Sequence, residues 1–341
     1  MLLIASLACF AVMSSQASRD WVVYEGKSGP GHGKSIVFLS GDEEYRSEEG
    51  LPQLAKILAY RHGFKCTVLF SVGENGEIDP NRKDNEPGLE ALDSADLCVM
   101  LLRFREWPDA QMSHFVNYYL AGKPIMALRT STHAFNYSAG SKSPFSKYSW
   151  QNKDWLGGFG KQVLGETWVN HWGSHKVQAT RGVFESGSEK SPILRGVDEI
   201  FGTTDVYEAS PPADAEIFVR GQVLVGMNSD DKPAAYRKKT VAGADQDVNT
   251  PMMPIVWTRH YRNESGKVNK ILTTTMGAAT DLLDEGLRRL LVNGAFWAVG
   301  LEREIPKRAN VSLIGDYQPS MFGFDGFRKG VKPSDLEAGK Q

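Results

Sequence analysis

The sequence predicts an α/β fold with a mostly parallel central sheet that is covered by helices on both faces. Apolar runs at 64–70 and 97–102 are almost uninterrupted, which is typical of strands buried on both sides. Segments with apolar residues at helical spacing alternate with such runs, and glycines at 63 and 122 follow two of these segments. Strands and helices that alternate in this way predict parallel strand pairing.

The first half of the chain follows this alternation most clearly. Leu51, Leu54, Ile57 and Leu58 recur at helical spacing and predict an amphipathic helix that stops at Gly63. The expected elements are a strand at 34–40, a helix at 48–62, strands at 64–70 and 97–102, a helix at 109–121 and a strand at 124–128.

The second half of the chain is less regular. Residues 131–172 are rich in aromatic side chains and weakly periodic, and a stretch of that length is commonly a functional loop. Residues 263–266 separate two β-rich runs and predict a hairpin that adds antiparallel strands to the sheet. The other expected elements are strands at 176–180, 216–219, 223–227, 254–260 and 267–275, and a helix from about 281 to 299.

The composition is that of a globular protein. Of 341 residues, 41% are hydrophobic and 23% are charged, and 39 Lys and Arg against 41 Asp and Glu leave a net charge of −2. A dedicated nucleic-acid-binding protein normally carries a basic surplus, so we expect no nucleic-acid partner. The oligomeric state does not follow from these values.

The first 17 residues predict export. They contain no charged residue, and an apolar run at 2–13 precedes Ser15-Gln16-Ala17, a small-x-small cleavage pattern. The run is too short for a helix that spans a bilayer, so we expect no stable membrane insertion and a periplasmic or extracellular location. A lipid anchor on Cys9 is the alternative, although Ser6 stands where such a signal has an aliphatic residue.

Two further cysteines lie inside apolar runs. Cys66 and Cys98 are expected on buried strands, where thiols are usually inert core residues. A disulfide between them is the alternative in an exported protein.

Three loops are expected to surround the ligand crevice, because ligands of parallel sheets bind at the carboxyl ends of the strands. These loops begin at Gly41, Arg103 and Arg129. The first carries Glu43, Glu44, Tyr45 and Arg46, in which a carboxylate would serve as general base or bond to sugar hydroxyls. The alternative is that these acidic residues only complement a helix dipole.

Arginines end two of the expected strands. Arg103, Arg105 and Arg129 would converge on one rim and bind a carboxylate, a phosphate or a polyhydroxylated ligand through forked hydrogen bonds. The alternative is that they pair with neighbouring carboxylates, namely Glu43, Glu44 and Glu106.

His171 and His175 lie four residues apart, a spacing that places two imidazoles on one side of a helix or strand, as a divalent metal requires. His133, Glu166 or a carboxylate among 42–44 would complete the ligand set. The alternative is a pair of hydrogen-bonded imidazoles at a boundary between loop and core. The aromatic residues of the region, including Trp172, suit the C–H faces of sugar rings, or else they pack the loop onto its own domain.

Four separated segments resemble the ThuA-like family, a group linked to trehalose utilisation. They are residues 37–46, 124–135, 275–277 and 288–300, and the resemblance spans 34–302. It implies a flavodoxin-like, class I glutamine-amidotransferase-like three-layer sandwich, in the exported bacterial branch found in Planctomycetes. The implied organisation is a signal peptide at 1–17, a flexible linker at 18–33, one domain at 34–302 and a C-terminal extension at 303–341.

The sequence departs from the patterns of this fold and family at several positions. Amidotransferases of this fold have a cysteine on the turn after a core strand, where this chain has Leu128-Arg129-Thr130, so glutaminase activity is excluded. Arg129 stands near a position that is His in typical members. Three further polar positions differ, at Ser191-Pro192-Ile193, Thr204-Asp205-Val206-Tyr207 and Gly277-Ala278.

The resulting expectation is an exported enzyme of carbohydrate catabolism that acts on a glycoside or a 3-keto-sugar derivative. Its partner would be a small carbohydrate ligand. One divalent metal is the single cofactor considered, and the sequence does not decide whether it is bound. The expected catalytic residues are His133, His171, His175 and Glu44, and the expected substrate-binding residues are Glu43, Tyr45, Arg46, Arg103, Arg105, Arg129 and Trp172. The alternative is a non-catalytic sugar-binding or scaffold protein on the same fold.

Overall fold

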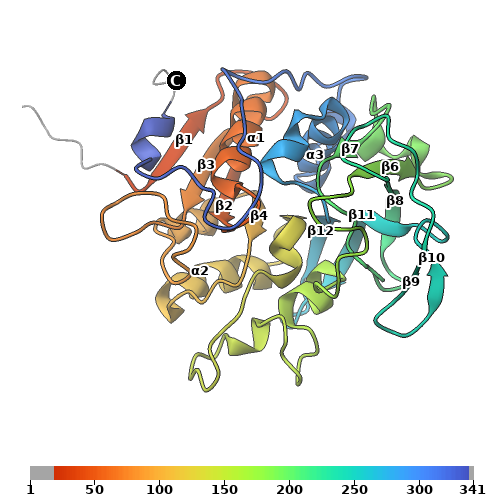
Figure 1. Cartoon of the computed structure of the whole chain (residues 1–341). Helices are drawn as coiled ribbons and strands as arrows, with labels where there is room; N and C mark the ends of the chain where they lie inside the picture. Colours follow the sequence, from red (N-terminus) through yellow and green to blue (C-terminus); the bar gives the residue numbers. More distant parts are fainter. Residues whose placement is uncertain (1–18, 338–341) are drawn as a thin grey trace, which may run out of the picture.

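The computed structural model describes residues 19–337, and its centre is a ten-stranded mixed sheet (Figure 1). The predicted signal peptide and Cys9 lie outside the described residues. The strands follow the order β1-β3-β2-β4-β5-β12-β11-β8-β6-β7. The α/β class predicted from the sequence is therefore confirmed.

The middle of the sheet is parallel and its two sides are antiparallel. β3, β2, β4, β5 and β12 run parallel, and β1 pairs antiparallel with β3. Beyond β12, each strand pairs antiparallel with the next. The strands of the parallel part are β2 (Ser35–Gly41), β3 (Lys65–Phe70), β4 (Leu97–Leu102), β5 (Ile125–Leu128) and β12 (Val268–Thr274). The antiparallel additions are β1 (Trp21–Glu25), β6 (Thr180–Phe184), β7 (Phe201–Gly202), β8 (Glu216–Val223) and β11 (Met253–Arg262).

The parallel strands are buried on both faces, as their apolar runs predict. On β4, Val99 and Leu101 pack in the core beneath the helices α1 (Ser47–His62) and α3 (Glu285–Ala298). Cys98 and Met100 point to the other face, against α2 (Asp109–Leu120). α1 and α3 therefore cover one face and α2 the other (Figure 1). Cys66 and Cys98 are free thiols buried in the core, so their predicted burial on strands is confirmed and the disulfide alternative is not adopted.

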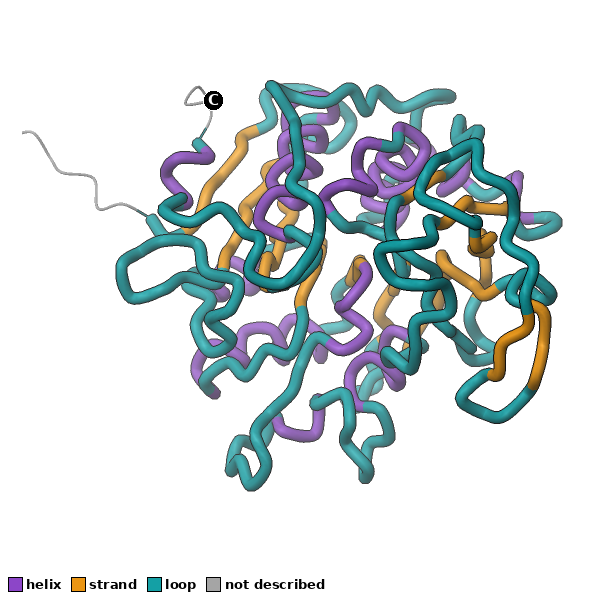
Figure 2. Tube along the Cα trace, in the orientation of Figure 1, coloured by secondary structure: helices purple, strands orange, loops and turns teal. Residues whose placement is uncertain are grey.

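The aromatic segment 131–172 is irregular, as expected. It contains short helical turns but no strand, and Figure 2 draws it mainly as loop below the sheet. Its rings join the core beside α2, where Phe135, Tyr148 and Phe159 are buried. The packing alternative therefore holds for these rings. A small separate sheet of β9 (Arg237–Lys239) and β10 (Asp245–Asp247) lies outside the main sheet.

Several boundaries differ from the predictions for physical reasons. The segment 18–33, expected to be a flexible linker, contributes β1, whose Trp21 pairs with Leu69 at the sheet edge. The strand expected at 176–180 begins only at Thr180, because the residues before it form a turn in which Val177 N–H and Gln178 N–H donate to Ser174 O. The strand expected at 216–219 continues to Val223 as β8, whereas the strand expected at 223–227 is wrong, because the chain leaves the sheet after Val223. Gly221 within β8 lies against Ile255, and an added Cβ would approach that side chain to 2.7 Å.

Other predicted elements match closely. α1 ends at Gly63, whose φ of 86° allows its N–H to bond to the last carbonyls of the helix. β11 and β12 form the predicted antiparallel hairpin. The helix predicted from about 281 begins at Glu285, because the Asp284 side chain caps it by accepting a hydrogen bond from Leu287 N–H.

Residues 303–337, called the C-terminal segment below, return across α1 to the first strand. Val331 O accepts a hydrogen bond of 2.8 Å from Ile78 N–H, and Leu336 O accepts one of 2.8 Å from the Tyr24 hydroxyl. Within residues 19–337 no helix is long and apolar enough to cross a membrane.

Candidate functional site

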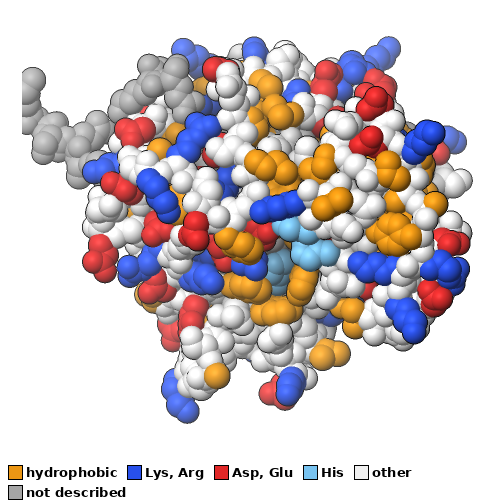
Figure 3. Space-filling model, viewed as in Figure 1, with side chains coloured by type: hydrophobic (Ala, Val, Ile, Leu, Met, Phe, Trp, Pro, Cys, Tyr) orange, Lys and Arg blue, Asp and Glu red, His pale blue; other side chains and the backbone are white. Residues whose placement is uncertain are grey.

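The candidate site lies at the carboxyl ends of β2, β4 and β5, as predicted for a parallel sheet. The segment that precedes β6 borders the site and pairs with the residues around Tyr207. Trp172 N–H donates to Val206 O at 2.7 Å, and His171 forms an isolated antiparallel bridge with Tyr207. Figure 3 shows histidine side chains at the surface in the middle of this face, bordered by hydrophobic and basic side chains.

One buried carboxylate binds both predicted histidines. Asp205 Oδ2 lies 2.8 Å from His171 Nδ1, and Asp205 Oδ1 lies 3.1 Å from His175 Nδ1. Arg129 Nη2 donates to Asp205 Oδ1 at 2.8 Å. Burial alone would raise the pKa of Asp205, but Arg129 and the two imidazoles outweigh it and hold that pKa below its ordinary value. Asp205 is therefore an ionised anchor for both rings.

His175 is bonded through both ring nitrogens. Its Nδ1 faces Asp205, and its Nε2 lies 3.1 Å from Glu44 Oε1. These two carboxylates raise the pKa of His175 to about 9, so the ring is an imidazolium at neutral pH. A quarter of the side chain is exposed, which leaves this cation at the surface of the site.

His171 is bonded through one nitrogen only. Its Nδ1 donates to Asp205, and within residues 19–337 its Nε2 makes no hydrogen bond. The side chain is 34% exposed, and its ring centroid lies 4.8 Å from that of His175. A carboxylate that holds Nδ1–H fixes the tautomer in which Nε2 carries a lone pair, the arrangement of a general base.

Arg129 supports the pair from beneath. Its guanidinium is fully buried between the rings of Tyr45 and Tyr207, at 4.6 and 3.7 Å from their centroids. It also donates to the main-chain carbonyls of Asp205 and Thr275, each at 2.7 Å. Arg129 has a left-handed φ of 42°, and it turns the chain away from β5 where it meets these partners.

Asp42 shapes the loop that carries Glu44. Its Oδ1 accepts hydrogen bonds from Glu44 N–H and Tyr45 N–H, and Thr130 donates to its Oδ2. Burial, together with the neighbouring charge of Glu43, raises the pKa of Asp42. The carboxylate is enclosed by its own loop and does not reach the surface.

Glu43 forms the centre of a second ion cluster. Arg103 Nη1 donates to Glu43 Oε1, and Arg105 Nη2 donates to Glu43 Oε2 at 3.1 Å. Lys83 Nζ lies 3.7 Å from the same carboxylate. Arg103 and Arg105 therefore pair with a neighbouring carboxylate, as the alternative interpretation of the sequence expects. Arg103 remains 18% exposed, so it can still contact a ligand.

His133 lies among aromatic rings. The ring centroids of Phe104, Trp168 and Trp150 are 5.1, 5.9 and 6.1 Å from that of His133. Burial, with the charges of Arg103 and Arg129, holds the pKa of His133 well below its ordinary value, so the ring is neutral. Trp168 contacts the rings of both His133 and His171, so His133 meets the pair through an aromatic ring.

Five predicted substrate-binding residues are buried and have partners inside the protein, and their contact with a ligand stays a prediction. Arg46 donates to the carbonyls of Glu43 and Gly323, and Arg105 to those of Pro80 and Arg82. Nη2 of Arg46 and Nη1 of Arg105 are thus used by main-chain oxygens, which sequence spacing does not reveal. The fully buried set is Tyr45, Arg46, Arg105, Arg129 and Trp172.

The two predicted metal ligands His171 and His175 do come together, but the carboxylate beside them is Asp205, which was not among the residues expected to complete the set. One ligand atom each from His171, His175 and Asp205 lies within 4.8 Å of the others, and these are residue types that bind divalent metals. Metal binding needs neutral imidazoles, whereas the pKa of His175 is about 9 and Arg129 already occupies Asp205. Glu166 pairs with Lys161 instead. The residue types fit a metal site. The proton on His175 and the ion pair between Arg129 and Asp205 fit a hydrogen-bonded histidine pair instead.

Sequence reasoning missed several residues of the site. Asp205 lies 30 positions from His175 in the sequence, in a segment that departs from the family pattern. Trp168 stacks edge-on against His171, at 5.7 Å between centroids. Phe322 lies 5.5 Å from the His175 ring, although it belongs to a segment expected outside the domain. Trp168 lies in the aromatic segment 131–172, which the sequence predicts to be a functional loop. Nothing in the sequence points to Phe322.

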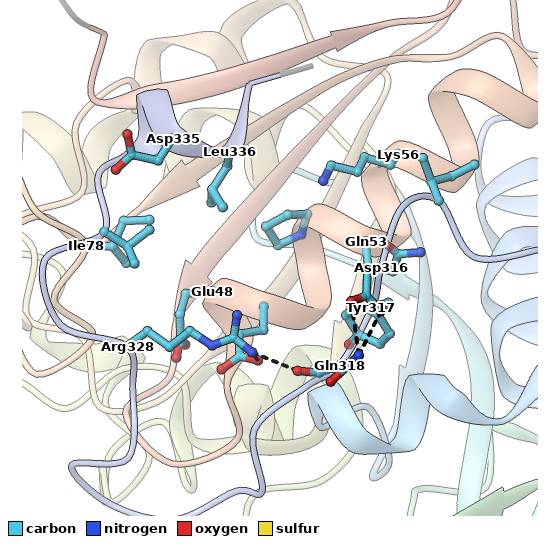
Figure 4. Close-up of a pocket in the computed structure, with 14 residues that line it drawn as sticks. Glu48, Gln53, Lys56, Ile78, Asp316, Tyr317, Gln318, Arg328, Asp335 and Leu336 are labelled. Carbon is cyan, nitrogen blue, oxygen red and sulfur yellow. Dashed lines mark hydrogen bonds and ion pairs between the residues drawn. The ribbon is translucent and has the colours of Figure 1, made fainter. Parts of the chain in front are cut away.

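A separate cavity of about 370 Å³ lies between α1 and the C-terminal segment (Figure 4). Pro52, Ile78 and Leu336 give it apolar walls, and Glu48 on α1 lies at one end. Burial raises the pKa of Glu48 to about 7, although Arg46 Nε at 3.6 Å opposes the shift. The histidine pair does not line this cavity, so the two features are distinct.

No protein-family model and no curated protein matches this sequence. Among solved structures, a putative ThuA-like protein from Parabacteroides merdae is 13% identical, with a TM-score of 0.47 over 78% of this chain and 90% of that one. A putative ThuA-like protein from Bacteroides uniformis is 16% identical, with a TM-score of 0.45 over 80% and 93%. Likeness at this level carries neither function nor site residues from those proteins to this chain.

Proposed function

We propose that this protein is an enzyme of carbohydrate catabolism in which His171 is the general base and His175 supplies positive charge. The observation that carries the proposal is the Asp205 carboxylate, which binds Nδ1 of both rings from a buried position. A carboxylate–histidine pair of this kind orients the imidazole and stabilises the imidazolium that forms when it accepts a proton. Proton transfer by a positioned side chain contributes about 10²–10⁴-fold to rate.

The chemistry suits a 3-keto-sugar derivative, a substrate that the ThuA-like resemblance implies. His171 Nε2 removes the proton on the carbon next to the ketone, and the imidazolium of His175 stabilises the enolate that results. The electrons of that enolate then expel the glycosidic oxygen from the neighbouring carbon, and the proton taken by His171 passes to the leaving alcohol. The products are an unsaturated keto sugar and the released alcohol, so atoms and charges balance.

We also propose the finer assignments that the sequence motifs support. They are a flavodoxin-like, class I glutamine-amidotransferase-like sandwich in a ThuA-like domain at 34–302, and export through a signal at 1–17 in the branch found in Planctomycetes. The segment 128–130 carries no cysteine, which argues against amide transfer from glutamine.

The test is a turnover screen of the purified protein on disaccharides and their 3-keto forms. We expect activity on a 3-keto form, and loss of at least about 10²-fold in kcat for His171→Ala. His114→Ala is the matched control, since His114 Nδ1 lies 2.9 Å from Asp93 in a histidine–carboxylate pair outside the site. Equal loss in both variants, or full activity in His171→Ala, would contradict the base assignment.

A non-catalytic sugar-binding protein is the second candidate. The observation that favours it is that Glu43 and Glu44 are both engaged by cations of the chain, so neither carboxylate is free to act as a base. Binding of a disaccharide without turnover of any form in the screen would select this candidate.

A further inference from the structure

The C-terminal segment is fastened to the loop that follows β2. Gly323 N–H donates to Glu44 O at 2.8 Å, and Arg46 Nη2 donates to Gly323 O at 2.8 Å. Arg46 is fully buried and also bonds to Glu43 O at 2.7 Å, so one guanidinium joins the two segments. The residues around Gly323 are therefore held at the same place as the carboxylate that contacts His175.

Two phenylalanines flank this fastening and have different surroundings. Phe322 is buried, with its ring 5.2 Å from that of Tyr45 and 5.5 Å from that of His175. Phe324 is 56% exposed, which is unusual for a large apolar side chain held so close to a buried ion cluster. Phe322 anchors the segment, whereas Phe324 presents its ring to solvent.

The exposed ring lies close to a cation. The guanidinium carbon of Arg103 lies 5.0 Å from the Phe324 ring centroid and 4.3 Å from that of Phe104. Arg103 is in turn paired with Glu43, and Lys83 lies 5.7 Å from the Phe104 ring. The exposed ring of Phe324 thus stands beside the guanidinium of Arg103, which the Glu43 carboxylate holds in place.

This combination matches what a pyranose ring offers. One face of such a ring is made of C–H bonds and packs on an aromatic side chain, while the hydroxyls around its edge bond to charged groups. An acyclic polyol has the same hydroxyls and lacks the flat C–H face. The ring of Phe324 therefore discriminates between ligands that share their polar groups.

We propose that the C-terminal segment completes the candidate site, and that Phe324 is a specificity-determining residue that packs on a pyranose ring. The inference rests on the proposed carbohydrate function and names the form of sugar that this site selects. Arg103 would bond to the sugar hydroxyls beside that ring.

The test measures binding of trehalose and of glucitol by saturation-transfer NMR and titration calorimetry, with no turnover required. We expect the full-length protein to bind trehalose more tightly than glucitol, and Phe324→Ala to weaken trehalose binding by roughly 3–10-fold. Phe324→Tyr keeps the ring and should bind as the wild type does. Met321→Ala is the control, because Met321 is a large exposed apolar residue of the same segment.

Each outcome bears on the inference. Equal weakening by Phe324→Ala and Met321→Ala, an unchanged affinity in Phe324→Ala, or no sugar binding by the wild type would overturn it. Because binding is measured apart from turnover, Phe324-dependent binding in a protein without turnover would leave the inference standing and refute the enzyme proposal. Turnover together with sugar binding that does not depend on Phe324 would refute the inference and leave the enzyme proposal standing.

Discussion

Arg129 Nη2 lies 2.8 Å from Asp205 Oδ1, and neither side chain is accessible to solvent. The guanidinium satisfies a carboxylate that also holds two imidazoles, so this single ion pair connects the interior of the protein to the exposed histidines. Removal of one member of a buried ion pair leaves an uncompensated charge, which is far more costly than loss of an exposed pair.

Asp205→Asn should therefore destabilise the protein by about 3–5 kcal/mol, because it leaves the Arg129 charge buried and unpaired. Urea unfolding at neutral pH measures this. Asp214→Asn is the control, since Asp214 pairs with Arg259 but is 53% exposed, and its loss should cost about 1 kcal/mol or less. Similar losses in the two variants would show that the Asp205 pair is not buried in the way described.

The imidazolium of His175 makes stability depend on pH. Its folded-state pKa of about 9 lies above the ordinary 6.5, so its contribution is fully present below pH 6.5 and is lost as the pH rises through about 9. The difference in unfolding free energy between wild type and His175→Gln should therefore shrink across that interval. NMR titration of the His175 ring nitrogens gives the pKa directly, and a value near 6.5 would refute the two-carboxylate arrangement.

Glu48, an acidic group, should also make the unfolding free energy depend on pH. Burial raises its pKa from 4.5 to about 7, so its favourable contribution is complete below pH 4.5 and is lost as the pH rises through about 7. Glu48→Gln removes the buried charge and should stabilise the protein above pH 7, by up to roughly 3 kcal/mol. Glu90→Gln, at an exposed position, is the control. A Glu48→Gln protein that is less stable than wild type at alkaline pH would contradict this.

Close backbone contact at Gly160 should make it intolerant of a side chain. An added Cβ would lie 1.8 Å from Thr132 O, next to His133, so the two segments would have to separate. We expect Gly160→Ala to cost about 1–3 kcal/mol or more and to shift the NMR signals of His133. Gly73→Ala, where the nearest atom is a side-chain oxygen at 3.2 Å, should cost less.

The hydrogen bonds and the ion pair around Asp205 should exclude a resident metal. We expect protein prepared without a His tag to hold no stoichiometric divalent metal at neutral pH, because His175 carries a proton and Arg129 occupies Asp205. Elemental analysis measures this. One metal ion per chain that disappears in His171→Ala would refute the hydrogen-bonded pair and support a metal centre.

Local patterns were sufficient to predict the parallel strands, α1 and the meeting of His171 with His175. Apolar runs and Gly63 report on burial and helix ends, and these are properties of short segments. Asp205 was not predictable as their partner, because it reaches them through a bridge between His171 and Tyr207 that no local pattern encodes.

The arginines show a different limit. Spacing predicted that Arg103, Arg105 and Arg129 would end strands at one edge, and they lie in the loops that follow β4 and β5. Whether a guanidinium then faces solvent or the interior depends on distant carbonyls, such as Thr275 O for Arg129 and Pro80 O for Arg105. Tertiary partners decided that only Arg103 remains partly exposed.

The bond between Arg46 and Gly323 joins residues 277 positions apart in the sequence. At a synthesis rate of about 5–20 residues per second, roughly 15–55 seconds separate the appearance of the two partners on the ribosome. During that interval the loop after β2 lacks the strap that holds it. A nascent chain would thus have its parallel strands before it has a finished site, and sugar recognition would begin only after Gly323 has emerged.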